Sequence, residues 1–158
     1  MPRIFVLADS KWQMTKDQNF LCPCCSGKPY VKCCAVYHEG KPAETATALM
    51  RSRYSAYALN NIDYIIRTLH PRHPSLSQNL STLKAEKLKF SLSTTFEKLE
   101  ILDAKELPDQ ATVVFIAYLK QGDEDVTFTE RSYFAKVDGK WLYVNGDLFP
   151  GENRSVKM

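Results

Sequence analysis

Four cysteines within thirteen residues are the side chains of this sequence best placed to do chemistry. The string CPCCSGKPYVKCC holds a Cys-x-Cys pair, an eight-residue spacer and a Cys-Cys pair, so that the thiols fall at Cys22, Cys24, Cys33 and Cys34. Thiolates this close together can surround one zinc ion in a tetrahedron, at sulfur–zinc distances of about 2.3 Å. The spacing therefore predicts one structural Zn²⁺ bound by these four residues.

The fifth cysteine, Cys25, is interpreted as a bystander next to this site, and the other interpretation makes it an alternative or reactive ligand. Disulfides explain the cluster poorly, because the number of cysteines is odd and neighbouring thiols form only strained bridges. A reduced surface loop without metal stays as the alternative. Cys33 and Cys34 can reach one ion only from a turn or a helix start, since neighbours in a strand point to opposite faces.

A zinc ion held by four thiolates keeps no open coordination position for water or substrate. The cluster therefore indicates a structural element or a recognition surface, and it argues against metal catalysis. We predict no catalytic residue within it.

Helical periodicity dominates the segment that follows the cysteines. Apolar residues recur at helical spacing over 43–59, over 62–69 and, more loosely, over 76–90. Pro42 suits the first turn of the first helix, Glu44 suits its positive end, and Asn61 suits the N-cap of the second helix. Three helices are therefore expected before residue 93.

From Ser93 onward the pattern changes to that of strands. Strands are expected at 95–102, 112–120, 126–137 and 140–144, of which the second is apolar on both faces and belongs inside a sheet. Pro108-Asp109 and Asp138-Gly139 predict turns, the acidic run 122–125 predicts a connection, and Asn145-Gly146 predicts the end of the last strand. Helices followed by consecutive antiparallel strands predict an α+β fold.

The composition is that of a soluble globular protein: 158 residues, 44% hydrophobic and 25% charged. No apolar run is long enough to cross a bilayer, so we expect a cytoplasmic protein without membrane insertion. The formal charge is +3, and four thiolates on one zinc ion lower it to about +1, which argues against a nucleic-acid partner. The expected organisation is a lead at 1–20, a zinc knuckle at 21–40, an α+β domain at 41–149 and a polar tail at 150–158.

The string 22–34 resembles the SEC-C motif, whose usual form is CxCGSGKKYKKCC. The residues that match the motif are the four predicted ligands together with Ser26, Gly27, Lys28 and Tyr30, whereas Cys25 stands where the motif usually has glycine. The motif is best known at the C-terminus of the SecA translocation ATPase, where it forms a zinc-dependent surface for chaperone and ribosome contact. The resemblance implies a zinc site and a link to secretion or translation machinery.

Further strings resemble the YchJ family, in the order in which that family carries them. They are ALMRSRYSAYALNNIDYI (48–65), TLHP (68–71), LEILDA (99–104), FTERSYF (128–134) and DGKWLYVNGD (138–147). The resemblance implies a nuclear transport factor 2-like (NTF2-like) domain, a curved antiparallel sheet wrapped by helices into a cone. Some members carry a second SEC-C motif, which this chain lacks because no cysteine follows Cys34. The family as a class has no known biochemical activity.

A cone of this kind offers a pocket, and several polar residues are candidates to line it. They are Arg51, Tyr54, Tyr57, His70, Glu130, Arg131 and Trp141, with Arg53 beside them. Each also has an ordinary structural explanation: packing for Tyr54, Tyr57 and Trp141, capping for His70, and ion pairs for the charged residues.

Three functions of different classes follow from these residues. The leading hypothesis is a cytoplasmic protein-interaction module built on the zinc knuckle. The second is a small-molecule-binding protein or enzyme that uses the cone pocket. The third is nucleic-acid binding by the knuckle through Lys28, Lys32 and a stacking Tyr30.

Overall fold

Helices occupy the first half of the described chain and strands the second half, which confirms the predicted α+β fold. The computed structural model describes residues 20–158. The helices are α1 (Cys34–His38), α2 (Ala46–Ala58), α3 (Ile62–Arg67) and α4 (Leu80–Leu92), with short 3-10 turns at Tyr30–Lys32 and Pro74–Ser77. The strands are β1 (Thr95–Glu106), β2 (Gln110–Gln121), β3 (Glu124–Asp125), β4 (Phe128–Val137) and β5 (Lys140–Pro150). The lead expected at 1–20 lies outside the described residues except for Phe20.

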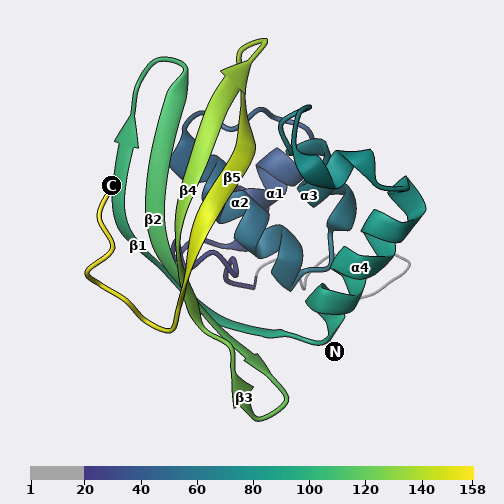
Figure 1. Cartoon of the computed structure of the whole chain (residues 1–158), viewed down its shortest axis with the longest axis vertical. Helices are drawn as coiled ribbons and strands as arrows, with labels where there is room; N and C mark the ends of the chain where they lie inside the picture. Colours follow the sequence, from purple (N-terminus) through teal and green to yellow (C-terminus); the bar gives the residue numbers. More distant parts are fainter. Residues whose placement is uncertain (1–19) are drawn as a thin grey trace.

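The strands form one antiparallel sheet in the order β1-β2-β4-β5, with the short β3 paired to the end of β2. β2 lies between two long neighbours, as its apolar residues on both faces predicted. Irregularities in the β1–β2 and β4–β5 registers add local twist, which helps the sheet to curve. Figure 1 shows a curved, unclosed sheet with the helices on its concave side.

The core lies between helix α2 and the concave face of the sheet. Its buried members come mainly from α2, α3 and β2, and they include Leu49, Met50, Tyr54, Ile65, Val113, Phe115 and Leu119. Residues 68–70 also pair with the middle of β5, where Tyr143 N–H donates to the Thr68 carbonyl and His70 N–H donates to the Tyr143 carbonyl, both at 2.8 Å. The helical layer is therefore tied to the sheet by backbone bonds as well as by packing.

Helix α2 begins at Ala46, three residues later than the sequence predicted. Thr45 is its N-cap, and the Thr45 hydroxyl accepts a hydrogen bond from Ala48 N–H at 3.0 Å. The carboxylate at the positive end of the helix is that of Glu106, which accepts from Ala46 N–H at 3.0 Å. Glu44, which was expected there, instead forms an exposed salt bridge of 3.2 Å with Lys41.

The other helix ends follow the side chains that can cap them. Asn61 is the predicted N-cap of α3, where its side chain accepts from Tyr64 N–H at 3.2 Å. Asn79 caps α4 in the same way, so the helix expected over 76–90 begins at Leu80, after a separate 3-10 turn.

Both predicted hairpin turns are present. Leu107 N–H donates to the Gln110 carbonyl at 2.7 Å across the turn that contains Pro108-Asp109. Asp138 and Gly139, with φ of 53° and 77°, form a two-residue turn that suits the twist of the strands on either side. The strand expected over 126–137 begins two residues later, at Phe128, and the acidic run expected as a connection contains the two-residue strand β3.

The prediction that Asn145-Gly146 ends the last strand is wrong, since β5 continues to Pro150. Gly146 lies inside the strand, opposite Ser132 of β4. A Cβ atom at this position would overlap the Glu130 carboxylate, so glycine is required by a close approach and not by a turn.

The C-terminal residues after β5 turn back along the sheet, toward β1 in Figure 1. Arg154 pairs with Glu100 of β1 at 2.7 Å, and Arg131 of β4 donates to the Lys157 carbonyl at 2.8 Å. The polar tail predicted from residue 150 is thus held against the strands. Among residues 20–158, no helix has the length and apolar character needed to cross a membrane.

Candidate metal centre and cavity

The cysteine segment is a tight hairpin that leads into a short helix. Cys22 N–H donates to the Lys28 carbonyl at 2.9 Å, which closes the hairpin, and Gly27 lies in its turn with φ of 84°. Cys33 follows the 3-10 turn, and Cys34 is the first residue of α1. The Cys-Cys pair therefore lies at a helix start, as the chemistry of two neighbouring ligands required.

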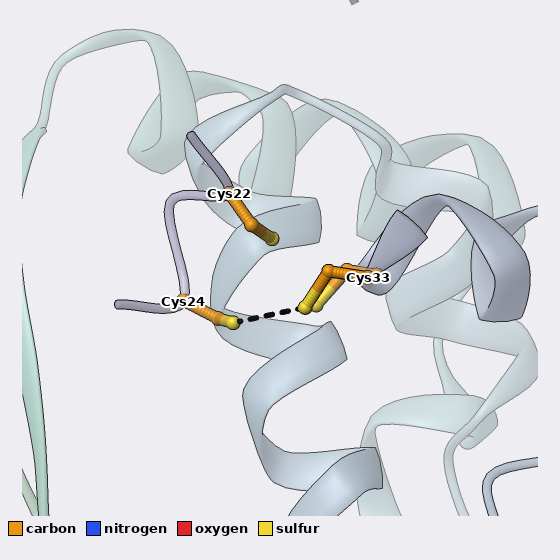
Figure 2. Close-up of side chains that lie close together, drawn as sticks. Cys22, Cys24 and Cys33 are labelled. Atoms are coloured by element: carbon orange, nitrogen blue, oxygen red, sulfur yellow. Dashed lines mark hydrogen bonds between the residues drawn. The ribbon is translucent and has the colours of Figure 1, made fainter. Parts of the chain in front are cut away.

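All four predicted ligand sulfurs converge on one point. The Sγ atoms of Cys22, Cys24, Cys33 and Cys34 lie within 4.8 Å of one another, and those of Cys24 and Cys33 are 3.6 Å apart. A tetrahedron with metal–sulfur bonds of 2.3 Å has sulfur–sulfur edges of about 3.8 Å. Figure 2 shows the thiols of Cys22, Cys24 and Cys33 pointing toward one another from the two arms of the segment. The arrangement can hold a metal ion.

The thiols are shielded from water and hydrogen-bonded to one another. Cys22, Cys24 and Cys34 are buried, and Cys33 is partly buried. Hydrogen bonds with Cys22 and Cys34 lower the pKa of Cys24, whereas the bond with Cys24, together with burial, raises the pKa of Cys22 to about 12. A cation at the centre would favour the thiolate form of all four.

Cys25 lies outside the group of four close sulfurs and is exposed. Its φ is 66°, a left-handed conformation that favours glycine, and this matches the glycine that the SEC-C motif usually has here. Its sulfur accepts a hydrogen bond from Leu99 N–H of β1 at 3.4 Å. Within the described residues, Cys25 is therefore a bystander to the cluster that contacts the sheet.

Helix α2 anchors the cysteine segment to the body of the protein. Arg51 Nη1 donates to the Cys24 carbonyl at 2.6 Å. From α1, His38 Nε2 donates to the Ser52 carbonyl at 2.9 Å. This bond leaves His38 Nδ1 to accept from Tyr30 O–H at 2.8 Å. Arg51, a predicted pocket residue, thus belongs to the junction between the knuckle and α2.

His38 is a residue that the sequence reasoning missed. Its ring packs against Tyr64 of α3, at 4.6 Å between ring centroids, and Arg67 donates to its carbonyl. Its place four residues after Cys34, one helical turn away, was the available signal.

A second feature is a cavity of about 530 Å³ between α2, α4 and the concave face of the sheet. Aromatic side chains dominate its wall: Tyr54, Tyr57, Phe90, Phe96, Phe115, Phe128, Phe134 and Tyr143. From α2, Met50, Arg53, Tyr54 and Tyr57 face it at the i, i+3, i+4 and i+7 positions of one helical stripe. Leu148 lies at its mouth, because this lining residue is 65% exposed.

Three of the seven predicted pocket residues line this cavity, namely Tyr54, Tyr57 and Glu130. The other four lie elsewhere. Arg51 contacts the knuckle, and His70 Nδ1 accepts from Arg72 N–H in the loop after α3. Arg131 pairs with Asp147 at 3.0 Å, and Trp141 is buried in the core.

Glu130 and Arg131 could not both face the cavity, because neighbouring strand residues point to opposite faces. Glu130 is buried, and its Oε2 accepts hydrogen bonds from Ser132 Oγ and from Tyr143 O–H, the latter at 2.8 Å. Burial and the nearby carboxylate raise the pKa of Tyr143, so its phenol stays protonated and donates. Sequence reasoning missed Ser132 and Tyr143; Ser132 lies two residues from Glu130 on the same face of β4.

Residues 45–146 match the sequence model of the family described as YchJ, middle NTF2-like domain. The chain belongs to the YchJ-like family. A UPF0225 protein from Actinobacillus succinogenes is 38% identical over 131 residues, which cover 81% of this chain and 82% of that protein. Another from Vibrio vulnificus is 36% identical over 134 residues, covering 83% and 76%. The predicted family is thereby confirmed.

Two solved structures are similar to this YchJ-like chain, and both are described as SEC-C motif containing proteins. One, from Rhodopseudomonas palustris, is 34% identical with a TM-score of 0.71, and the match covers 81% of this chain and 98% of that one. The other, from Psychrobacter arcticus, is 26% identical with a TM-score of 0.67, covering 91% and 86%. These similarities confirm the helices on an unclosed sheet with a cysteine cluster near the N-terminus.

Proposed function

We propose that Cys22, Cys24, Cys33 and Cys34 bind one Zn²⁺ as four thiolates. The sulfur spacing suits a tetrahedral thiolate site, and four soft ligands, three of them buried, suit zinc. Ser26 Oγ lies 3.1 Å from Cys33 Sγ, where it can donate to the thiolate and orient it. The ion would supply structure, because four protein ligands fill its coordination sphere.

We further propose that the zinc-bound segment, residues 21–40, is a cytoplasmic protein-interaction module. The observation that carries this proposal is that the segment is fixed to α2 and still presents exposed side chains. Arg51 and His38 form the bonds to α2, and Leu21, Lys28 and Lys32 are exposed. Leu21 is 67% exposed, so the segment offers an apolar side chain for contact.

One exposed apolar side chain and two exposed lysines on the same short segment suit a protein partner that is both acidic and apolar. The resemblance to the SEC-C motif points to the secretion or translation machinery as its source. Nucleic acid is not proposed, since two lysines give little of the charge that a phosphate backbone attracts.

The test is affinity capture from native lysate with three variants of the full chain. Lys28→Glu/Lys32→Glu removes the exposed charges and leaves the thiols intact, whereas Cys22→Ala/Cys24→Ala removes the metal site. Lys84→Glu/Lys89→Glu, on exposed α4 positions, is the control. We expect proteins that are captured by the wild type and the control and lost in both knuckle variants. Identical captures by the wild type and Lys28→Glu/Lys32→Glu would contradict the interaction function.

A second function is favoured by the cavity. Its volume of about 530 Å³ lies within the range of roughly 300–1,000 Å³ that small-molecule sites occupy. Its aromatic wall contains one buried carboxylate, that of Glu130, in the way that polar groups orient a ligand in an apolar site. We infer that the NTF2-like domain binds a small molecule there.

The test of this second function is ligand-observed NMR with a library of aromatic fragments, competed by Leu148→Trp. The larger side chain at the exposed mouth should obstruct entry and weaken binding while the fold is retained. Fragments that bind the wild type and Leu148→Trp equally would place binding outside the cavity.

A further inference from the structure

Glu130 and Arg53 both face the cavity, and they do not pair with each other. The Glu130 carboxylate uses one oxygen, Oε2, to accept from Ser132 and Tyr143. Among residues 20–158, no donor is found for Oε1 and no cation lies within salt-bridge distance of Glu130. A buried carboxylate with unused acceptor capacity therefore lines the cavity.

Arg53 is also buried, and some of its N–H donors have no acceptor among residues 20–158. Its Nη1 donates to the Ile65 carbonyl at 2.8 Å and to Thr68 Oγ1 at 2.6 Å. Its guanidinium lies over the Tyr143 ring, 4.7 Å from the ring centroid. No residue of the described chain accepts from Nε or Nη2, so two of the three guanidinium nitrogens are free to bind a ligand.

Tyr143 fixes the distance between these two charges. Arg53 lies over the face of its ring, and Glu130 accepts from the hydroxyl at the far end of the same side chain. The two charged groups are held apart by one aromatic ring, and both line the same cavity. A ligand that satisfied both would need a donor for Glu130 and an acceptor for Arg53, with a rigid spacer between them.

The charges around the cavity also favour an anionic acceptor. Lys87 of α4 is a second cation in the wall, with its Nζ 3.4 Å from the Tyr57 hydroxyl. His73 is neutral near pH 7, because burial and the nearby cations Lys87 and Arg53 lower its pKa. Two cations and one carboxylate thus line the wall, so a ligand with a negative group is attracted to it.

We propose that the cavity binds an aromatic carboxylate that carries a hydrogen-bond donor at its opposite end, with the carboxylate on Arg53 and the donor on Glu130. The aromatic wall packs against the planar body, and the volume accommodates about two fused rings. This inference rests on the second function proposed above and names its ligand class.

The test is isothermal titration calorimetry of the full chain with three probes that share a naphthalene body. 6-Amino-2-naphthoate carries both polar groups, 2-naphthoate lacks the donor, and 2-naphthylamine lacks the carboxylate. We expect 6-amino-2-naphthoate to bind at least about tenfold more tightly than either of the others, because each of them leaves a buried partner unsatisfied.

Variants assign the two ends of the ligand. In Glu130→Gln, the hydroxyls of Ser132 and Tyr143 still donate to the amide oxygen. The amide NH₂ group, which is itself a donor, then faces the donor of the ligand and cannot accept from it. The advantage of 6-amino-2-naphthoate over 2-naphthoate should then fall to threefold or less, while 2-naphthoate binding reports an intact cavity. Arg53→Gln should weaken both carboxylates about tenfold and spare 2-naphthylamine. Glu97→Gln, an exposed carboxylate on β1, is the control and should change nothing.

The outcomes separate the two claims. Equal binding of all three probes would overturn the proposed ligand class and leave the cavity as an apolar binding site. Failure of all three to bind the wild type would overturn both. An advantage of 6-amino-2-naphthoate that survives in Glu130→Gln would overturn the assignment of the donor to Glu130.

Discussion

At the scale of residues, Gly146 and Glu130 show how one close contact determines both a strand and a site. The Glu130 carboxylate, held by Ser132 and Tyr143, occupies the space beside Gly146 in which any other residue would place its Cβ atom. The glycine therefore makes room for a carboxylate that lines the cavity. A sequence alone does not distinguish it from a turn glycine, because the distinction depends on a side chain sixteen positions earlier in the chain.

Gly146→Ala is expected to destabilise the protein by about 2 kcal/mol, because the added methyl group overlaps the Glu130 carboxylate and forces it to move. Chemical denaturation measures the free energy of unfolding. The double variant Gly146→Ala/Glu130→Ala removes the obstructing side chain, so the alanine should then cost less than in the presence of Glu130. An equal cost in both backgrounds would show that the overlap is not the cause.

His38 gives the junction between knuckle and body a dependence on pH. Burial, reinforced by Arg67, lowers its pKa from 6.5 to about 4. Tyr30, Tyr64 and the Ser52 carbonyl surround the ring, and it bonds to two of them in the neutral form. Between pH 6.5 and 4 His38 is protonated in the unfolded chain but stays neutral in the folded protein. The stability that this group contributes is therefore present above pH 6.5 and is lost as the pH falls toward 4.

The free energy of unfolding should fall by about 2 kcal/mol more in the wild type than in His38→Gln over this pH interval. Both proteins carry the same four thiols, so the difference isolates the histidine. His70→Gln, in the loop after α3, is the matched control and should behave as the wild type does. Parallel pH profiles of the wild type and His38→Gln would contradict the lowered pKa of His38.

At the scale of elements, helix α2 joins the two candidate sites. Arg51 fixes the knuckle through the Cys24 carbonyl, and two positions later Arg53 faces the cavity. Sequence periodicity found this helix and placed Tyr54 and Tyr57 on its apolar stripe. It did not find the start of the helix, because the choice between Pro42 and Thr45 depends on Glu106, a carboxylate brought there from the end of β1.

Arg51→Ala should lower stability by about 1–2 kcal/mol, because it leaves the Cys24 carbonyl without its charged donor. Thermal and chemical unfolding measure the loss. Arg72→Ala removes an exposed arginine from the loop after α3 and should change stability by less than about 0.5 kcal/mol. The claim that α2 anchors the knuckle fails if the two variants behave alike.

In the strands, too, features set by neighbouring residues could be predicted, and features set by contacts between distant residues could not. Asp138-Gly139 specified its hairpin correctly, because the positive φ of both residues is a local requirement. Both Glu130 and Arg131 were predicted for the pocket, although alternation along β4 allows only one of them to face it. The meeting of Glu130 with Tyr143 depends on the register between β4 and β5. The cavity and Glu130 could therefore be expected from the sequence and the resemblance, whereas the partners of Glu130, Ser132 and Tyr143, could be identified only from the fold.

At the scale of the whole molecule, the chain consists of a cysteine knuckle fixed to the helical side of an NTF2-like domain whose concave face encloses a cavity. The four converging sulfurs were fully predictable, since their spacing lies within thirteen residues and needs no tertiary information. The junction through His38 and Arg51 was not, because it forms between segments that are far apart in the sequence. The knuckle is thus integrated with the domain.

The measurement that tests the central claim most directly is the zinc content of the purified full chain by elemental mass spectrometry. One zinc per chain is expected in the wild type and in Cys25→Ala, because Cys25 lies outside the cluster, and loss of zinc is expected in Cys22→Ala and Cys33→Ala. Folded wild-type protein that contains no zinc and takes up none when it is supplied would contradict the account.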